Sequence, residues 1–364
     1  MHPSPDWPVC RRGFCRLDQV FTDPSAREGA YAGFASLVNQ DPADPYVWCN
    51  YADVLEQNGH LEQASAAFEH AMTLGPNLPS VLIRAGYFDF TYGWLDRGFV
   101  ISNRILVQTD GLDAILFSYL QYFGKGTASL LGTAIPASHR PAQSWAAWIG
   151  RNGSEDDVRE TWAWMVQNHL TDENIALDLT RTLWQRQFFR TAQELWSNWL
   201  GPAQGDHQVG EVIFNRQFKD TPDGSPFDWT IATQPSIEIS RAHGLDVHFT
   251  GAENVELNIQ QSAVVSPGRY RFSAEIESEG LTTDQRPFFH IFDPGNRARL
   301  DITTPQISSA SPRSETDLDF TVTPDMQVLN IQLERRESER FDNKIQGTLH
   351  VYEVSLVPID QRPN

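Results

Sequence analysis

Histidine and carboxylate side chains are the residues of this chain that could do acid–base or metal chemistry, and their spacing matches no catalytic motif. The sequence has no Gly-x-Ser-x-Gly, no His-Glu-x-x-His, no Walker loop and no Gly-x-Gly-x-x-Gly after a strand. His243 and His248 lie on or beside one expected strand without a third metal ligand. The 47 acidic residues supply many accidental pairs, so no glycosidase pair stands out. We therefore expect no catalytic residue and no cofactor, with a glycan-active enzyme as an alternative.

Apolar residues at helical spacing organise the first half of the chain. Two such stripes lie between Pro45 and Pro76, separated by Gly59: Trp48, Tyr51, Ala52 and Leu55, then Leu61, Ala64, Phe68 and Ala71. The same pattern recurs 34 residues earlier, where the second stripe falls on Ala30, Phe34 and Leu37. It recurs again later, where Trp145, Ile149, Val158, Trp162 and Met165 are followed at this offset by Leu179, Leu183, Ala192, Trp196 and Trp199. The repeated unit is a pair of antiparallel helices.

This helix pair and its period resemble the tetratricopeptide family. The resemblance implies stacked helix pairs with a concave surface that binds a protein partner. We therefore expect an N-terminal extension over residues 1–24 and an α-solenoid over residues 25–203. In that family, ligands usually lie in the groove lined by the first helix of each pair. The residues expected there, either as a partner groove or as a solvated face, are Asn50, Asp53, Arg84, Tyr87 and Phe88.

From residue 211 onward, apolar residues alternate with polar ones, which is the pattern of β-strands. A clear example is the alternation of Tyr270, Phe272, Ala274 and Ile276 with polar neighbours. About ten short strands separated by Gly, Pro, Asp and Ser turns predict an all-β jelly roll or sandwich over residues 211–360. A Gly-, Pro- and Gln-containing linker over residues 204–210 precedes it. The expected fold class is multidomain, an α-solenoid followed by a β-sandwich.

Several fragments of the second half are similar to carbohydrate-binding-module-like, or galactose-binding-like, jelly rolls. They are Pro226-Phe227-Asp228-Trp229, the stretch from Gln260 to Ser273 with its Pro-Gly turn, and the last strand LHVYEVSL. Glu353 stands where that family usually has Asp. Helical repeats followed by such a sandwich resemble bacterial exopolysaccharide-associated proteins. This implies a scaffold in exopolysaccharide assembly or export, or alternatively a glycan-binding sandwich with the solenoid as spacer.

A sugar site needs an exposed aromatic ring and polar groups that bind hydroxyls. Trp229, Tyr270 and Tyr352 lie at strand positions where we expect them to face the core. The best remaining group is Phe289, His290, Asn296, Arg297 and Arg299, for which a buried strand ending in a Pro-Gly turn is the alternative. The run from Glu334 to Asp342 is either a solvated hairpin or a source of guanidinium groups for acidic sugars, from Arg335, Arg336 and Arg340.

The resemblance to carbohydrate-binding modules also implies a structural Ca²⁺ site, because such ions take oxygen ligands from acidic turns. The acidic residues in question are Asp220, Asp223 and Asp228, with Glu353 on the last strand. We expect no other metal.

Charge and hydropathy exclude several partners. The net charge is −19 without a basic patch, which argues against nucleic acid and anionic membranes. No apolar run is long enough to span a membrane, and the start lacks a signal-peptide core. The chain is then cytoplasmic, or extracytoplasmic if an export signal lies upstream. Cys49 is expected to be buried, and Cys10 and Cys15 form either a local disulfide or reduced thiols.

Overall fold

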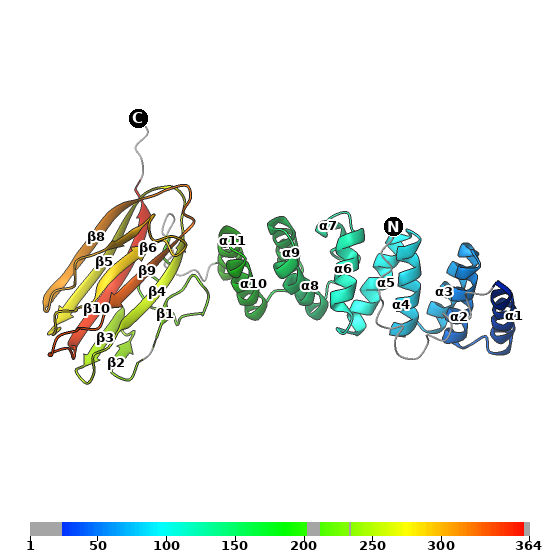
Figure 1. Ribbon diagram of the computed structural model, residues 1–364, viewed down its shortest axis with the longest axis horizontal. Helices are drawn as coiled ribbons and strands as arrows, with labels where there is room; N and C mark the ends of the chain where they lie inside the picture. Colours follow the sequence, from blue (N-terminus) through cyan, green and yellow to red (C-terminus); the bar gives the residue numbers. More distant parts are fainter. Residues whose placement is uncertain (1–23, 202–211, 233, 360–364) are drawn as a thin grey trace, which may run out of the picture. The chain divides into compact units, whose positions relative to one another are not determined.

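The computed structural model describes residues 24–201, 212–232 and 234–359. In this part of the chain, helices come first and strands follow (Figure 1). The helices are α1 (Pro24–Gln40), α2 (Pro45–Gln57), α3 (Leu61–Leu74), α4 (Pro79–Thr91), α5 (Leu95–Gln108), α6 (Asp113–Phe123), α7 (Thr127–Leu130), α8 (His139–Asn152), α9 (Glu155–Gln167), α10 (Glu173–Gln185) and α11 (Phe189–Leu200). The expected N-terminal extension, the linker, Cys10 and Cys15 fall outside the described residues, apart from Pro24. In the described part, no helix combines the length and apolar character that a membrane span requires.

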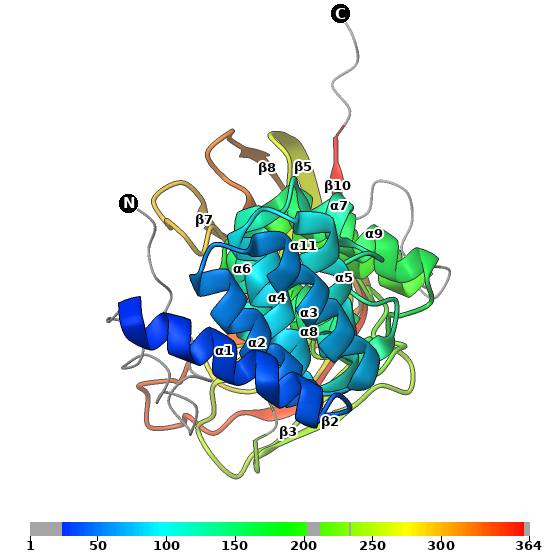
Figure 2. The same ribbon diagram turned by 90° about the vertical axis from the view of Figure 1, so that its right-hand side faces the viewer.

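The predicted repeat is visible in the helix starts. Helices α2 and α4 begin at Pro45 and Pro79, and α3 and α5 at Leu61 and Leu95, a spacing of 34 residues in both cases. The same spacing separates α8 from α10 and α9 from α11. The short helix α7 interrupts the pattern after α6. Helices α2 and α3 lie side by side, as do α4 and α5 (Figures 1 and 2).

Local signals set the ends of these helices. Proline occupies the first position of α2 and α4, where its missing N–H costs nothing. The side chain of Ser154 accepts from the N–H of Asp157, and Asp157 accepts from the N–H of Ser154, which forms a capping box before α9. Between the helices of a pair, the chain turns through a left-handed residue, Gly59 (φ 78°) or Gly93 (φ 79°).

The strands form two antiparallel five-stranded sheets that pack into a sandwich. One sheet has the order β1-β4-β9-β6-β7 and the other β2-β3-β10-β5-β8. The strands are β1 (Thr230–Ile231), β2 (Ile237–Ser240), β3 (Leu245–Thr250), β4 (Leu257–Val264), β5 (Gly268–Glu279), β6 (Phe288–Phe292), β7 (Asp301–Thr303), β8 (Ser311–Val322), β9 (Val328–Arg335) and β10 (Gln346–Pro358). These elements confirm the predicted fold class, helical repeats followed by a β-sandwich.

The sandwich core contains Trp229 and Tyr270, as expected. Tyr352 corrects the expectation, because it lies outside this core where the pairing register of β10 shifts. Its hydroxyl donates to Glu277 Oε2 at 2.7 Å. Cys49 is buried in the helical part, as expected, and burial raises the pKa of its thiol to about 12.

The chain divides into two compact units, and the division falls between Thr171 and Asp172. Helices α10 and α11 therefore group with the sandwich. Arg181 donates from Nη2 to the carbonyl oxygen of Gly224 at 2.8 Å, and the Trp184 ring meets the Phe227 ring edge-on with centroids 5.3 Å apart. The predicted linker lies outside the described residues, so the domain boundaries given above stay a prediction.

Candidate functional sites in the helical repeats and the sandwich

Three of the predicted groove residues meet between α2 and α4. Arg84 donates from Nη2 to Asn50 Oδ1 at 3.0 Å and forms an ion pair with the carboxylate of Asp53. Asn50 and Arg84 are equivalent positions of successive repeats. A second equivalent pair also meets, since Ser80 Oγ lies 3.4 Å from the hydroxyl of Tyr46. The first helices of neighbouring repeats therefore place their equivalent polar residues side by side.

Glu56 and Tyr92 extend this cluster and were not predicted. They form a side-chain hydrogen bond with each other. Burial, together with the charge of Asp53, raises the pKa of Glu56 to about 7, although the bond to Tyr92 and the charge of Arg84 oppose the rise. Burial also raises the pKa of Asp53, against the opposing effect of Arg84. The guanidinium group of Arg84 thus pairs with Asp53, and its charge also acts on Glu56. The spacing of Asp53 and Glu56, three apart on one helix, was the available sequence signal.

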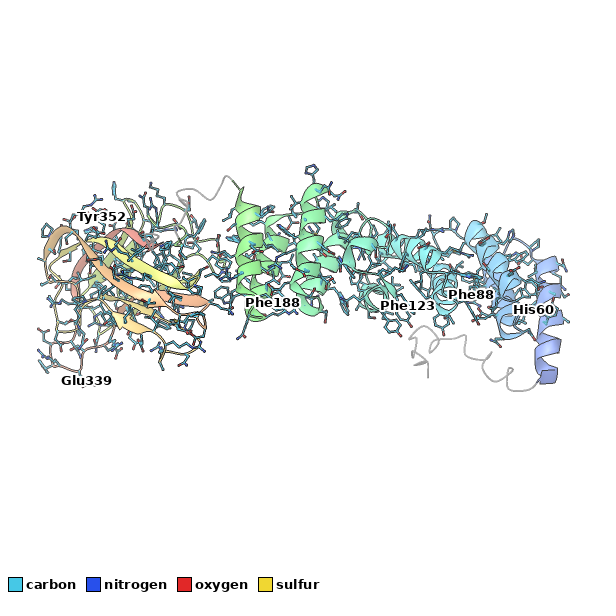
Figure 3. All side chains as sticks on the ribbon, turned by 90° about the horizontal axis from the view of Figure 1, so that it is seen from above. His60, Phe88, Phe123, Phe188, Glu339 and Tyr352 are labelled. Atoms are coloured by element: carbon cyan, nitrogen blue, oxygen red, sulfur yellow. The ribbon has the colours of Figure 1, made fainter. Side chains whose placement is uncertain are left out.

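Phe88 corrects the predicted groove. Phe88, whose position is labelled in Figure 3, is fully buried. Its ring packs against those of Phe68, Tyr92 and Trp94, with centroids 5.2, 4.9 and 5.2 Å away. The neighbouring Tyr87 is 37% exposed. We use the name α2–α4 surface for the group that remains: Tyr46, Asn50, Asp53, Glu56, Arg84 and Tyr87.

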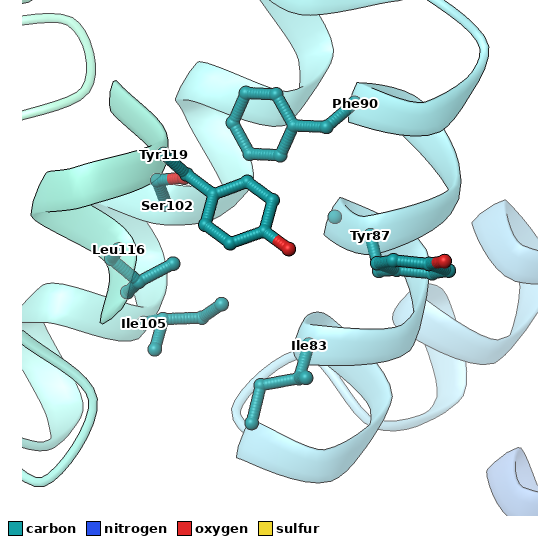
Figure 4. A pocket seen from close by; sticks show the side chains of 8 residues that line it. Ile83, Tyr87, Phe90, Ser102, Ile105, Leu116 and Tyr119 are labelled. Carbon is teal, nitrogen blue, oxygen red and sulfur yellow. The ribbon is translucent and has the colours of Figure 1, made fainter. Parts of the chain in front are cut away.

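A cavity beside Tyr87 is too small to be a ligand site. It lies between α4, α5 and α6 and is lined by side chains that include Phe90, Ile105, Leu116 and Tyr119 (Figure 4). Its volume is about 10 Å³, which is room for one water molecule. Pockets for small organic ligands are far larger, so this cavity belongs to the packing of the repeats.

In the sandwich, strand β6 divides the predicted glycan residues between two faces. Phe289 and Ile291 belong to the core, and Phe289 is 1% exposed, so it is unable to contact a sugar. Phe288, His290 and Phe292 alternate with them and project from the opposite side. The same side carries polar residues of β4 and β9, which face each other in register: Asn258 with Glu334, Gln260 with Gln332 and Ser262 with Asn330. We call this side the outer face of the first sheet.

His290 is held on this outer face between two carboxylates. Its Nε2 lies 2.5 Å from Asp301 Oδ1, and its Nδ1 lies 2.8 Å from Glu334 Oε2. Burial alone would raise the pKa of Glu334, but hydrogen bonds from Arg336 and His290 outweigh it and lower that pKa. Sequence reasoning missed Asp301 and Glu334, because only the pairing of β6 with β7 and β9 brings them to His290.

Two arginines cover the aromatic rings at the ends of this row. The guanidinium carbon of Arg297 lies 4.3 Å from the centroid of Phe292, and that of Arg336 lies 5.3 Å from the centroid of Phe288. The other predicted residues stabilise the turn after β6. Asn296 Oδ1 accepts from the N–H of Ala298, and Arg299 pairs with Asp293 and Asp325.

Arg335 is removed from the candidates for sugar binding. It is 1% exposed and donates to the backbone carbonyls of Gln285, Val255 and Asn343. It therefore anchors the loop after β9. Arg340 pairs with Asp284 at 3.0 Å in the same region.

Two residues of the implied Ca²⁺ site, Asp228 and Glu353, are engaged in protein contacts, whereas Asp223 Oδ2 is buried without a hydrogen bond to any described residue. Asp228 is buried and accepts from the N–H groups of Trp229 and Asp223, and burial raises its pKa to about 6. Glu353 pairs with Arg216 at 3.0 Å. Among the described residues, no three His, Cys, Asp or Glu side chains form a group that could hold a metal ion. The residues present do not fit this ion.

Comparisons with known proteins find similar structures but no family. The sequence matches no protein-family model and no curated protein. Solved structures that resemble parts of the chain include tailspike protein 4 of bacteriophage CBA120, in its enzymatically active domain (11% identity, TM-score 0.30), over 41% of this chain and 22% of that chain. Another is TmCBM61 in complex with β-1,4-galactotriose (10% identity, TM-score 0.30), over 41% of this chain and 99% of that chain. A third is YrrB, a tetratricopeptide-repeat protein with an unusual peptide-binding site (14% identity, TM-score 0.26), over 49% of this chain and 95% of that chain.

These neighbours include both helical-repeat proteins and carbohydrate-binding modules. At such identities and TM-scores, they carry no argument about ligands or activity. The function has to be argued from the α2–α4 surface and the outer face of the first sheet.

Proposed function

We propose that this protein is a non-enzymatic scaffold that binds a protein partner through the α2–α4 surface. The observation that carries the proposal is the bridging of successive repeats by Asn50, Asp53 and Arg84, beside the half-exposed rings of Tyr46 (38%) and Tyr87 (37%). Tyrosine and arginine are enriched among residues that dominate binding energy at interfaces. Fixed charged groups next to such rings suit an extended peptide. We further propose that it works in a bacterial exopolysaccharide assembly or export system, which rests only on the resemblance of helical repeats followed by such a sandwich to exopolysaccharide-associated proteins.

The test is affinity capture with the full chain from cells of its source, followed by calorimetry on each captured protein. We expect Asn50→Ala combined with Tyr87→Ala to weaken the partner at least tenfold, because hot-spot side chains each contribute about 2 kcal/mol or more. Val107→Ala is the matched control, since Val107 is a 58% exposed apolar residue on α5, a second helix of a pair. If the double substitution leaves the affinity for every captured partner unchanged, the α2–α4 surface is not the binding site. If no protein binds the chain directly, the scaffold function is refuted.

A second candidate function is glycan binding by the outer face of the first sheet. It is favoured by the amide side chains of β4 and β9 that lie in register on this face, beside the buried row Phe288–His290–Phe292 of β6. Ser262 Oγ donates to Asn330 Oδ1, and Asn330 Nδ2 donates to Gln260 Oε1, both at 3.1 Å. These bonds hold the amides in place, and pre-ordered amides bind sugar hydroxyls at low entropic cost.

Glycan-array binding of the full chain tests this second candidate. We expect Gln332→Ala to weaken binding several-fold, because it removes an amide from the middle of the face. Thr321→Ala is the control, being an exposed polar residue of β8 in the other sheet. Equal losses in the two variants would contradict this placement of the site.

A further inference from the structure

The charged groups on and around the outer face of the first sheet are mostly paired. Glu334 is bound by Arg336 at 2.6 Å and Asp301 by His290 at 2.5 Å. Arg299 lies between Asp293 and Asp325 at 3.2 and 2.8 Å. Among the described residues, no carboxylate lies within ion-pair distance of Arg297, which follows β6, or of Arg286, which precedes it. The row of β6 therefore has an uncompensated guanidinium at each end.

Arg297 is also held in a defined orientation. Its guanidinium carbon is 4.3 Å from the ring centroid of Phe292. Phe292 is 6% exposed, because the guanidinium group of Arg297 and neighbouring groups cover its ring. A guanidinium stacked on a ring keeps its donor N–H groups at its edges, in one plane. Arg297 itself is exposed, so those donors face solvent. The planar fork of donors matches the two oxygens of a carboxylate.

At the other end of β6, Arg286 is half-buried. Its Nε atom is buried and makes no hydrogen bond to any described residue. Its two Nη groups are not among the buried atoms without a partner, so they are the donors of Arg286 that a ligand carboxylate could reach. Arg286 and Phe292 are six residues apart along an extended segment, which spans about 20 Å. A ligand that satisfies both arginines therefore has to be a polymer with acidic groups at intervals.

We propose that the outer face of the first sheet binds a polysaccharide that carries carboxylate groups, with Arg297 binding one carboxylate and Arg286 a second. The inference rests on the glycan-binding function proposed above and adds the charge of the ligand. Hydroxyl groups between the carboxylates would bind the amides of Gln260, Asn330 and Gln332. Arg297 and Arg286 then together separate acidic from neutral saccharides.

The experiment compares three uronate polymers, polygalacturonate, alginate and hyaluronate, with their carboxyl-reduced products, which keep the backbone and lose the charge. Binding of the full chain is measured by affinity electrophoresis and calorimetry. We expect at least one uronate to bind ten times or more tighter than its reduced form. Arg297→Gln should lower that preference several-fold, because the variant loses one of the two guanidinium groups that bind carboxylates.

Arg313→Gln is the matched control. Arg313 also lies over an aromatic ring, 4.0 Å from the centroid of Tyr352, but it belongs to the other sheet and is paired with Glu275 at 2.6 Å. This variant should bind uronates like the parent protein. Dextran sulfate provides a polyanion without carboxylates, and it should bind more weakly than the preferred uronate at equal ionic strength.

The outcomes separate the two levels of the proposal. If the protein binds reduced and uronate forms equally, the acidic ligand is refuted while glycan binding stands. If none of the polymers binds, glycan binding by this face is refuted as well. If Arg313→Gln and Arg297→Gln lower affinity alike, or dextran sulfate binds as tightly as the uronates, the attraction is general and Arg297 is not a specificity residue.

Discussion

Asp89 occupies a position of α4 that the preceding repeat gives to Leu55, 34 residues earlier. Both side chains are 1% exposed. The two carboxylate oxygens of Asp89 make no hydrogen bond to described residues, and Arg97 Nε lies 3.4 Å away. Burial raises the pKa of Asp89 to about 6, although the charge of Arg97 opposes the rise. A repeat that usually buries a leucine here instead buries an ionisable group.

We predict that the Asp89 carboxylate lowers the stability of the folded protein by an amount that depends on pH. Its folded pKa of about 6 is above the unfolded value of ~3.9, so the folded state retains the proton more strongly. The protonated side chain therefore stabilises the folded state fully below pH ~4. This contribution to the free energy of unfolding, up to ~3 kcal/mol, is lost as the pH rises through 6. Asp89→Asn should therefore gain stability relative to the parent between pH 4.5 and 7.5, as measured by urea unfolding of the helical signal. Asp41→Asn, an exposed carboxylate, should show no such trend, and a flat difference for Asp89→Asn would contradict the assignment.

At the scale of the element, three helix pairs turn through one left-handed residue, whereas the α8–α9 turn has none. Gly59 and Gly93 supply it in two pairs, whereas α10 and α11 use Gln187 with φ 64°. A Cβ at Gly93 would meet no atom within 4 Å, so its conformation alone decides the effect of a substitution. A Cβ at Gly33 would also meet no atom within 4 Å, but Gly33 lies inside α1 and its φ is not positive.

We predict opposite effects of alanine at these two open positions. Gly93→Ala should lower the free energy of unfolding by about 1 kcal/mol. The left-handed conformation costs an L-residue ~1–2 kcal/mol, and alanine offsets part of this cost because it restricts the unfolded chain more than glycine does. Gly33→Ala should stabilise by about 1 kcal/mol, since alanine is the better helix former. Thermal unfolding followed by circular dichroism measures both. A stabilised Gly93→Ala variant would show that this turn is not left-handed in solution.

At the scale of the molecule, helices α10 and α11 form part of the unit that contains the sandwich. Besides Arg181 and Trp184, Arg190 contributes a contact, with Nη2 3.3 Å from Ser266 Oγ. The Trp184 ring packs on both Phe189 and Phe227, which joins the helix pair to the sandwich. This grouping differs from a division at the 204–210 linker.

We predict that residues 172–364 fold as one cooperative unit. A fragment starting at residue 212 should melt at a lower temperature, because it exposes the surface around Phe227. Trp184→Ala should destabilise the longer fragment by about 2 kcal/mol, less than a fully buried tryptophan would. Scanning calorimetry, with the helical and strand signals of circular dichroism recorded in parallel, measures the melting temperatures of the two fragments. Equal melting temperatures of the two fragments would instead favour separable domains, with the boundary at the linker.

The fold class was predictable from the sequence, because both halves carry a periodicity that local geometry imposes. Apolar residues such as Ala64 and Phe68 repeat at helical spacing and again at 34 residues, and the alternation of Tyr270 and Phe272 with polar neighbours is a strand pattern. Asn50, Asp53 and Arg84 could also be predicted to meet, since equivalent positions of stacked repeats are neighbours.

Which of these residues are accessible depends on how the helices and strands pack together. Phe88 and Tyr87 are adjacent on a helix packed against several others, so helical spacing does not tell which one is buried. Strand β6 carries large aromatic residues on both faces, so its sequence does not distinguish Phe289, which lies in the core, from Phe292, which lies under Arg297. The partners of His290 come from strands 11 and 44 residues away, and the pairing of β6 with β7 and β9 brings them together.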